Sequence, residues 1–542
     1  MIKNKSTAEI LKYFVSIQSD TNTKMEIDVE SAICSYISEL PYFSRNNDYY
    51  GIEKLSSDSI GRGIVWALIK GSGNKTVILL NHHDTVDVND YKNLKDIAHD
   101  TDKIINALKT LNLSQEITQD IVSKDWIFGR GTADMKGGLS IQLKVIEDLS
   151  NSQFEKCNIL FLSVPDEETL STGMRDSGIL MKQLQQKYNL EYSLIINSEP
   201  HTRNNDNIPV IYEGSVGKTM VTVYIKGIKS HIGEIFAGFN PMLVLSKIIC
   251  NTEINSELCD NEMGEISVPP SWSFARDFKE CYDASIPESA GGYINFLTLS
   301  KTPKRILYIM KEICKKSMEE AIEHYNKNSS IYHQNNNPFP YPANVMLYDE
   351  FLSYARTNNK EEVDRNLENA YVKVAEKIKN GLISIPESNF EIIKSIIDCI
   401  EYNGPMIIIA ISPPYYPHIS NHKFDNLNSK LKKLSDTVSE INKSLNGFGA
   451  EKQQYFMGIS DLSYAAIQNY EDTAPYIKNN MPLWKDDFYS IQFESIKAFS
   501  IPVINIGPWG KDIHKYTERV YLPDIEVNTP FLIKGLISHM FS

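Results

Sequence analysis

The sequence predicts an α/β fold organised in two domains. Its 542 residues are more than one hydrophobic core usually serves, because single cores stop growing at about 250–300 residues. Over the N-terminal part, apolar segments of strand length alternate with segments of helical spacing, which is the pattern of a sheet flanked by helices. From about Glu213 the pattern changes and becomes more polar. We therefore expect a first domain, a second domain inserted into it, and a return to the first.

The first domain is expected to hold a mixed central sheet flanked by helices over residues 1–212. Helical apolar spacing covers residues 7–40. Strand patterns follow at 61–70 and 76–81, and the Gly-Ser-Gly-Asn between them predicts a hairpin or strand pair. Two further strands alternate with two helices: strands 158–164 and 193–197, helices 138–149 and 173–188.

The second domain is expected over residues 213–420, as an α+β domain. Residues 218–226 alternate like a half-exposed strand, and residues 240–251 follow helical spacing. The polar stretch 251–342 carries helical patches such as 304–325 and a proline-rich loop. We interpret it as a helical insertion that enlarges this domain.

The chain is expected to return to the first domain over residues 421–542. A helical run over 427–445, a strand over 501–506 and a last helix over 530–540 would complete the first sheet. The whole second domain would then interrupt the first one between strands of the same sheet.

Composition and charge exclude several classes of function. The net charge of −14 and the pI near 5.4 argue against nucleic-acid binding, which needs Lys and Arg to neutralise phosphates. The seven cysteines include no CxxC pair, so neither a disulfide framework nor a thiolate zinc site is indicated. The N-terminus shows no export signal, and the most apolar stretches are far shorter than the about 20 residues of a bilayer span. We expect a cytoplasmic protein with neither membrane nor nucleic-acid partners.

A first cluster of possible ligands follows the strand pattern at 76–81, in the sequence Asn-His-His-Asp-Thr-Val. In an extended chain His82 and Asp84 point to one side while His83 points to the other. His82 is therefore the better ligand candidate, and Asp84 is placed to fix the tautomer of its ring. By itself such a cluster is more often an ordinary polar surface.

Four further clusters carry acids or an imidazole, most of them directly after strand patterns. They are Asp134 in Gly-Arg-Gly-Thr-Ala-Asp-Met-Lys-Gly-Gly, the run Asp166-Glu167-Glu168, Glu199 before a proline, and His514 with Glu518 four residues on. Singly, each has a bland alternative, such as a Gly-rich turn or an acidic helix N-terminus. Together they favour a metal site, because crowded carboxylates require solvent or cations. Two imidazoles with three carboxylates suit paired zinc ions better than calcium or magnesium.

In order and wording these clusters resemble the motifs of the M20 family of metallopeptidases and amidohydrolases. The resemblance covers about residues 7–250 and 340–540 and fails over the insertion. It implies a zinc-peptidase-like catalytic domain, an inserted lid domain, and two divalent ions, most simply zinc, with cobalt or manganese as alternatives. The chain length and the segment Pro-Pro-Tyr-Tyr-Pro-His at 413–418 resemble the arginine-utilisation branch of the family.

The resemblance also implies roles for individual residues. His82 and Glu168 would bind one ion, Glu199 and His514 would bind the other, and Asp134 would bridge both. Glu167 is similar to the general base of the family, and Asp84 to the partner that orients the imidazole at position 82.

Two residues of the expected lid resemble substrate contacts. His231, in Gly-Ile-Lys-Ser-His-Ile-Gly, is similar to a histidine that steadies the tetrahedral intermediate, in dimeric members across the subunit interface. A homodimer through the lid is therefore expected. Arg356 resembles a residue of a lid strand whose guanidinium can bind a substrate carboxylate, although a solvated surface arginine fits the sequence equally.

The expected activity is hydrolysis of an amide or peptide bond in a small carboxylate-bearing substrate or short peptide. A carboxypeptidase or dipeptidase and an N-acyl or N-carbamoyl amino-acid hydrolase fit the motifs equally, and the arginine-utilisation likeness favours arginine or ornithine derivatives for the second. Glu199, where aminopeptidase-like members tend to have Asp, disfavours aminopeptidase action. A non-catalytic binding protein is a third hypothesis, opposed by the presence of every expected ligand and of Glu167.

Overall fold

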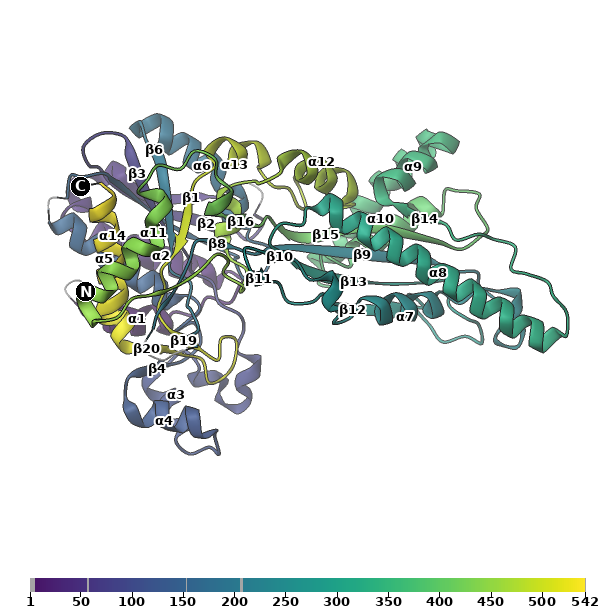
Figure 1. The fold of residues 1–542 in the computed structure, drawn as a ribbon, viewed down its shortest axis with the longest axis horizontal. Helices are drawn as coiled ribbons and strands as arrows, with labels where there is room; N and C mark the ends of the chain where they lie inside the picture. The colour runs from purple at the N-terminus through teal and green to yellow at the C-terminus, as the bar shows by residue number, and fades with distance from the viewer. Residues whose placement is uncertain (1–4, 56–57, 153, 205–207, 542) are drawn as a thin grey trace. The chain divides into compact units, whose positions relative to one another are not determined.

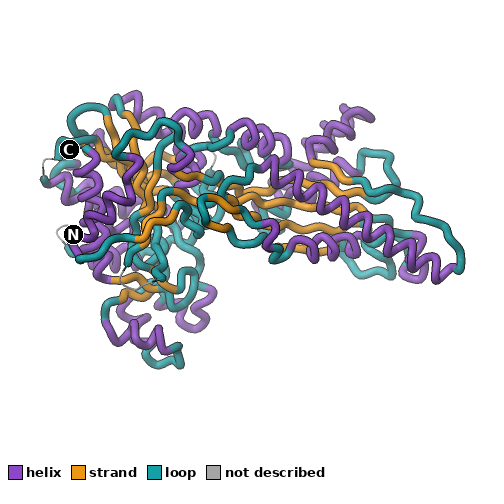
Figure 2. Tube along the Cα trace, viewed as in Figure 1, coloured by secondary structure: helices purple, strands orange, loops and turns teal. Residues whose placement is uncertain are grey.

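A computed structural model describes residues 5–55, 58–152, 154–204 and 208–541. The chain divides into two compact units (Figure 1). The first unit comprises Met1–Val216, Ile419–Ile467 and Ile491–Ser542, and the second comprises Gly217–His418 and Gln468–Ser490. Each unit has its own main sheet with helices packed against it, as the colours of Figure 2 show.

The first unit is built on an eight-stranded sheet in the order β1-β2-β5-β3-β6-β18-β7-β17. The strands are β1 (Tyr50–Lys54), β2 (Gly63–Ile69), β5 (Asn158–Val164), β3 (Lys75–His82), β6 (Glu191–Asn197), β18 (Val503–Asn505), β7 (Val210–Tyr212) and β17 (Glu451–Gln453). β3 is parallel to both of its neighbours, and β18 is parallel to β6. Because the carboxyl ends of parallel strands meet at one edge, the segments that follow β5, β3, β6 and β18 converge there.

β2 and β3 do not form the hairpin that the sequence pattern predicts. β5 lies between them, antiparallel to β2 and parallel to β3. On its other side β2 pairs with β1, a strand that the pattern does not indicate. Every residue of β5 is buried, so this apolar segment gains most from a place inside the sheet, covered on both faces. The predicted mixed sheet flanked by helices is otherwise confirmed.

Helices cover both faces of this sheet. α1 (Thr7–Ser16), α2 (Met25–Ser38), α5 (Lys136–Asn151), α11 (Leu434–Asn446) and α14 (Thr529–Met540) share one core with alternate residues of β3, Val77 and Leu79. The other residues of β3, such as Ile78, point to the opposite face. On that side α6 (Thr172–Tyr188) packs against β2 and α13 (Phe493–Phe499).

A small three-stranded sheet brings two distant segments of the first unit together. It consists of β19 (Gly510–Lys511), β20 (Arg519–Tyr521) and β4 (Trp126–Phe128), in that order and antiparallel. α3 (Thr101–Leu108) and α4 (Gln115–Ser123) pack beside β4. The pairing of β20 with β4 sets the Gly-rich segment after Phe128 against the segment that ends at Arg519.

The second unit is a five-stranded sheet in the order β12-β13-β9-β15-β14. Its strands are β12 (Ser271–Asp277), β13 (Ser289–Thr298), β9 (Gly217–Lys226), β15 (Met406–Tyr416) and β14 (Val345–Leu347). α9 (Tyr348–Lys379) and α10 (Ser388–Ile397) form one core with alternate residues of β15, such as Ile408. α7 (Pro241–Thr252) and α8 (Pro303–His333) pack together against the sheet, and Figure 1 shows α8 running along it.

The stretch 251–342 is more than the helical insertion that the sequence predicts. It supplies two of the five strands, β12 and β13, and β13 pairs with β9 along its whole length. In β12 the half-exposed Trp272 and Phe274 alternate with exposed small or polar residues, and the first four residues of β13 are small, so the apolar pattern of the sequence is weak there. The predicted helical patch is part of α8, which is longer than expected.

The return to the first unit is also less simple than predicted. Residues 468–490, expected within the C-terminal part of the first domain, belong to the second unit. They contain α12 (Tyr470–Asn480), which packs against α8 and α9. Leu483 lies in the core that α9 and α10 form, and Tyr371 donates a hydrogen bond to the carbonyl oxygen of Pro482. Burial of these apolar groups therefore holds the segment in the second unit.

Across the part of the chain that the structure describes, no helix combines the length and the apolar composition needed to cross a bilayer.

Candidate metal centre

The predicted ligands lie together in the first unit, beyond the ends of its strands. His82 is the last residue of β3, Glu168 follows β5, and Glu199 follows β6. His514 follows β18, in a loop where its own φ is +62°. Asp134 lies between β4 and α5. The strand order alone therefore brings three of the five residues to one edge, and the small sheet adds the other two.

Two overlapping groups of possible ligand atoms form around Asp134. The first group is His82, Asp134 and Glu199, and the second is Asp134, Glu168 and His514, with one atom from each residue within 4.8 Å of the others. Nε2 of His82 is 3.1 Å from Oδ1 of Asp134. Nε2 of His514 is 3.3 Å from Oδ2 of Asp134 and 3.1 Å from Glu168. These are two candidate sites that share the carboxylate of Asp134.

This grouping corrects the pairing expected from the sequence. His82 lies with Glu199, at 3.5 Å, and not with Glu168. β3 and β6 are adjacent and parallel, so the residues just beyond them are neighbours. Glu168 lies four residues beyond β5, and the turn carries its carboxylate toward His514.

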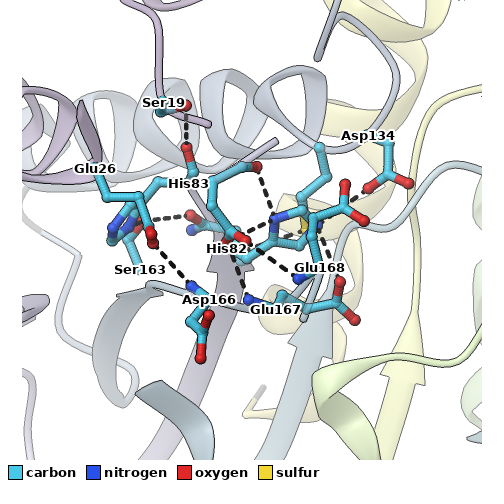
Figure 3. A network of polar contacts seen from close by, with 12 residues as sticks. Ser19, Glu26, His82, His83, Asp134, Ser163, Asp166, Glu167 and Glu168 are labelled. Carbon is cyan, nitrogen blue, oxygen red and sulfur yellow. Dashed lines mark hydrogen bonds and ion pairs between the residues drawn. The ribbon is translucent and has the colours of Figure 1, made fainter. Parts of the chain in front are cut away.

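Asp84 holds the imidazole of His82 and the turn after β5 at the same time. Its Oδ1 is 3.4 Å from Nδ1 of His82, as the alternation of the extended chain predicts. Its two oxygens also accept hydrogen bonds from the backbone N–H groups of Glu167 and Glu168, each 3.1 Å long. His83 points away and contacts the hydroxyl of Ser163 at 3.1 Å (Figure 3). His82 is therefore the histidine that faces the site.

Glu199 is fixed through its backbone. Its N–H donates to Oδ1 of Asn505, and the side-chain amide of Asn505 donates to the carbonyl oxygen of Glu199. Gly507 lies so close that a Cβ there would meet this carbonyl oxygen at 1.8 Å. Glycine is thus required at position 507 for the strand-end segments of β6 and β18 to approach each other.

Glu518 connects the two segments that carry Asp134 and His514. Its Oε1 accepts hydrogen bonds from the backbone N–H groups of Ala133 (3.1 Å) and Asp134 (3.3 Å). Its Oε2 is 2.7 Å from Nη1 of Arg130. The sequence placed Glu518 beside His514 in a motif, but no sequence signal showed that it would bind the backbone beneath Asp134.

The electrostatics of the site indicate an excess of negative charge that cations can neutralise. Burial, reinforced by Asp134, raises the pKa of Glu199 well above its ordinary value and that of Glu168 to about 7. Burial also raises the pKa of Glu167 strongly, opposed by His82. Hydrogen bonds from its ring to the carboxylates of Asp134 and Glu168 raise the pKa of His514 to about 11. Two imidazoles and several carboxylates at this spacing fit a pair of divalent cations.

Asp461 is an acid whose place at this site the sequence did not show. It is the last residue of the segment Gly-Ile-Ser-Asp at 458–461. The side chain is buried, and burial raises its pKa to about 7. Its charge acts on Glu167 and Glu199 and raises the pKa of both. A single acid in a turn gives no sequence pattern from which this proximity could be inferred.

The two expected substrate contacts lie in the second unit. His231 begins the short helix at Ile232–Ala237, where its Nδ1 accepts a hydrogen bond from the N–H of Gly233. Arg356 lies on α9, not on the strand that the resemblance implied, and its guanidinium is 2.8 Å from Asp364. Both arginine and aspartate are about 40% exposed. The backbone of α9 is interrupted at Asn359, whose φ of −155° and ψ of 83° are not helical, and this kink lies between Arg356 and its partner eight residues on.

Comparison with known proteins places the chain in a family. The family model described as peptidase family M20/M25/M40 matches residues 79–534, so the chain belongs to this family of hydrolases. It is 31% identical to the uncharacterised protein YqjN of Bacillus subtilis (strain 168), over 98% of this chain and 95% of that one. Protein RocB of the same organism is 29% identical, over 97% and 93%.

A solved structure agrees with this family at the level of the fold. A tripeptidase from Staphylococcus aureus subsp. aureus Mu50 superposes with a TM-score of 0.55 at 12% identity, covering 99% of this chain and 98% of that chain. The protein is therefore an enzyme of the M20 metallopeptidase and amidohydrolase class, with a candidate dinuclear metal centre.

Proposed function

We propose that the protein is a zinc-dependent hydrolase that cleaves an amide or peptide bond in a small carboxylate-bearing substrate. The observation that supports this most directly is the pair of ligand groups that share Asp134, with Glu167 beside them. His82 and Glu199 would hold one ion, and Glu168 and His514 the other. Cobalt or manganese could replace zinc, since the ligand set suits each of them.

Glu167 is the proposed general base. When bound, the two ions would polarise the scissile carbonyl and make water more acidic. Glu167 Oε2 lies 3.9 Å from Nε2 of His82, so its carboxylate faces the same space as the ligands without being part of either group. It would take a proton from the attacking water and deliver it to the leaving nitrogen. The raised pKa of this buried carboxyl suits a group that must hold the proton between the two steps.

Two substrate classes remain in the proposal. A carboxypeptidase or dipeptidase would use a free C-terminal carboxylate, whereas an N-acyl or N-carbamoyl amino-acid hydrolase would release an amino acid such as ornithine or arginine. Peptidase action is the first candidate, and the similarity to RocB supports the second class as the alternative. We also propose His231 as a substrate contact and a homodimer through the second unit, because the family resemblance implies them. Arg356 is a second proposed contact, although it lies on α9 and not on a strand, because its guanidinium can bind a carboxylate.

The test begins with protein stripped by a chelator and reloaded with Zn²⁺, Co²⁺ or Mn²⁺. Metal content is measured first, and two ions per chain are expected. Dipeptides, N-acetyl amino acids and N-carbamoyl amino acids, including ornithine and arginine derivatives, are then screened for release of amino acid. Hydrolysis of only one class decides between the two alternatives. No bound metal and no hydrolysis in any class would overturn the proposal.

Two variants separate the chemistry from the fold. Glu167→Gln is expected to retain both ions and to lose hydrolysis, by a factor of about 10²–10⁴ that is typical of a removed acid–base group. Glu155→Gln makes the same change at an exposed position and should leave kcat unchanged. Arg356→Ala should raise KM if the guanidinium binds the substrate carboxylate, and an unchanged KM would restrict Arg356 to its ion pair with Asp364.

A further inference from the structure

Three consecutive backbone N–H groups after β5 donate hydrogen bonds to buried carboxylates. Those of Glu167 and Glu168 donate to Asp84, as described above. That of Asp166 donates to Oε2 of Glu26, at 2.9 Å (Figure 3). We call residues 166–168 the acidic turn. The proposed base, Glu167, and one proposed ligand, Glu168, both belong to this turn. The backbone of the turn therefore sets the direction of both side chains.

Asp84 and Glu26 hold the acidic turn from two different elements. Asp84 follows β3 and also contacts His82, so it belongs to the site already described. Glu26 lies in the first turn of α2, far from the motifs, and its side chain is completely buried. Burial and the charge of Asp84 raise the pKa of Glu26 to about 8, opposed by Arg62. Nothing in the proposed chemistry accounts for Glu26.

Arg62 connects Glu26 to the side chain of Asp166. Its Nη1 is 2.8 Å from Oε1 of Glu26 and 3.0 Å from Oδ1 of Asp166. Its Nη2 is 2.9 Å from Asp58, the fourth member of the cluster. The side chains of Glu26, Arg62, Asp58 and Asp166 are all at most 5% exposed. Glu26 and Arg62 thus hold both the backbone N–H and the carboxylate of Asp166.

The backbone at Asp166 requires such support. Its φ is +69°, in the left-handed region that residues other than glycine seldom occupy. Its carboxylate also accepts hydrogen bonds from the N–H of Thr172, at 3.2 Å, and from the hydroxyls of Thr169 and Thr172. An uncommon backbone conformation persists only where its surroundings determine it, and here these contacts lie directly beside Glu167 and Glu168.

A stabilising role alone explains this cluster poorly. Burying one guanidinium with three carboxylates removes all four groups from water, and apolar side chains of similar volume are often at least as stabilising. What the ion cluster provides and apolar packing does not is a fixed direction, because each oxygen must meet a particular donor. The group whose direction it fixes is the acidic turn.

We infer that Glu26 and Arg62 are positioning residues for the proposed hydrolysis, and that they act through Asp166 to hold Glu167 and Glu168 in their working directions. The inference rests on the proposed function of these two glutamates. Neither Glu26 nor Arg62 touches the ligand groups. Their removal should therefore affect the rate of the reaction and the geometry of the metal site more than substrate affinity.

Kinetics of four variants test the inference. Arg62→Met should lower kcat about 10- to 100-fold, the usual effect of losing a group that orients a metal ligand, with little change in KM. Glu26→Ala should behave similarly. Glu26→Gln keeps an oxygen that can accept the hydrogen bond from Asp166, so it should recover part of the kcat that Glu26→Ala loses. Val438→Ala is the control, because Val438 is fully buried on α11 and is not part of the acidic turn or its ion cluster. This variant should lower stability and leave kcat unchanged.

Two measurements do not depend on activity. In metal-free protein, hydrogen exchange of a peptide covering 163–170 should be faster in Arg62→Met than in wild type, and unchanged in Val438→Ala. The visible spectrum of the Co²⁺-loaded protein should change in Arg62→Met, because Glu168 is a proposed ligand. If Arg62→Met does not fold, both measurements are made on Glu26→Ala and Glu26→Gln instead.

The outcomes of the two proposals are separable. The positioning role would be overturned if both Arg62→Met and Glu26→Ala had the same hydrogen exchange, Co²⁺ spectrum and kcat as the wild-type protein. That result would leave the hydrolase proposal intact. Wild-type protein that binds no metal and cleaves nothing would overturn the hydrolase proposal and the positioning role that rests on it. Faster exchange with a changed spectrum, and partial recovery in Glu26→Gln, would support the role.

Discussion

Arg130 and Glu518 form an ion pair of 2.7 Å in which each side chain is 1% exposed. The two residues are far apart in the sequence and lie at the same end of the β4–β20 pairing, just after Phe128 and just before Arg519. Because Glu518 also accepts the backbone N–H groups of Ala133 and Asp134, this one carboxylate supports the residue that both ligand groups share.

We predict that Glu518→Ala is strongly destabilising and weakens metal binding. Removing Glu518 leaves the buried Arg130 with the partly exposed Asp90 as its remaining counter-charge. Breaking a buried ion pair typically lowers the free energy of unfolding by about 3–5 kcal/mol. Urea unfolding and metal titration measure the two effects. Lys103→Ala, which breaks an exposed pair with Asp100, is the comparison and should change neither. Equal behaviour of the two variants would show that Glu518 does not support the site.

Metal binding should release protons near pH 7. Without metal, hydrogen bonds from its ring to the carboxylates of Asp134 and Glu168 raise the pKa of His514 to about 11, so the ring is protonated at neutral pH. A ligating imidazole must be neutral, so at least one proton leaves as the ion binds, and apparent affinity should rise with pH. Calorimetry in two buffers with different ionisation enthalpies measures the number released. A value of zero at pH 7 would contradict this prediction.

Stability should fall as the pH drops below about 6.5, partly because of His99. Burial, reinforced by Lys136 and Arg130, lowers the pKa of His99 to about 3. Near pH 6.5 the unfolded chain therefore binds a proton at His99 that the folded protein does not bind. The free energy of unfolding is then highest above pH 6.5 and decreases as the pH falls below it. Between pH 7 and pH 5 this amounts to about 2 kcal/mol for one such group. Thermal unfolding of His99→Gln at both pH values should show a smaller difference than wild type; the same difference would refute the assignment.

Asp461→Asn should move the acidic limb of the kcat profile to lower pH. The charge of Asp461 raises the pKa of Glu167, so removing it lets this base ionise at lower pH. The limb is measured with the substrate that the screen identifies. Asp425→Asn, an exposed change outside the site, is the control. A shift to higher pH, or none, would show that Asp461 does not act on the base.

The sequence predicts the site residues better than their arrangement. Each proposed ligand stands in a short motif, and most of these motifs follow strand patterns, so each could be found locally: His82, Asp134, Glu168, Glu199 and His514. That His82 lies with Glu199 depends on the order of β5, β3 and β6 in the sheet, and no local pattern encodes which strands become neighbours. The same reason explains the wrong hairpin of β2 and β3, which β5 separates.

Support from distant elements could not be predicted at all. In the sequence, Glu26 looks like an ordinary helix residue and Arg62 like an ordinary residue just before a strand. Only in the folded chain do they contact Asp166. Residues 468–490 were assigned to the wrong domain because their apolar groups are few, and tertiary packing against α8 and α9 decides where they lie.

The interleaved course of the chain has a consequence for biosynthesis. The edge of the first sheet is finished only when β18 has paired with β6, and the last ligand, His514, comes later still. The final segment of the second unit ends at residue 490. A nascent chain on the ribosome can therefore fold the whole second unit before all the candidate metal ligands have been synthesised. The enzyme should therefore stay inactive, and its acidic ligands should stay without their full set of partners, until the segment that carries His514 has been synthesised and has folded.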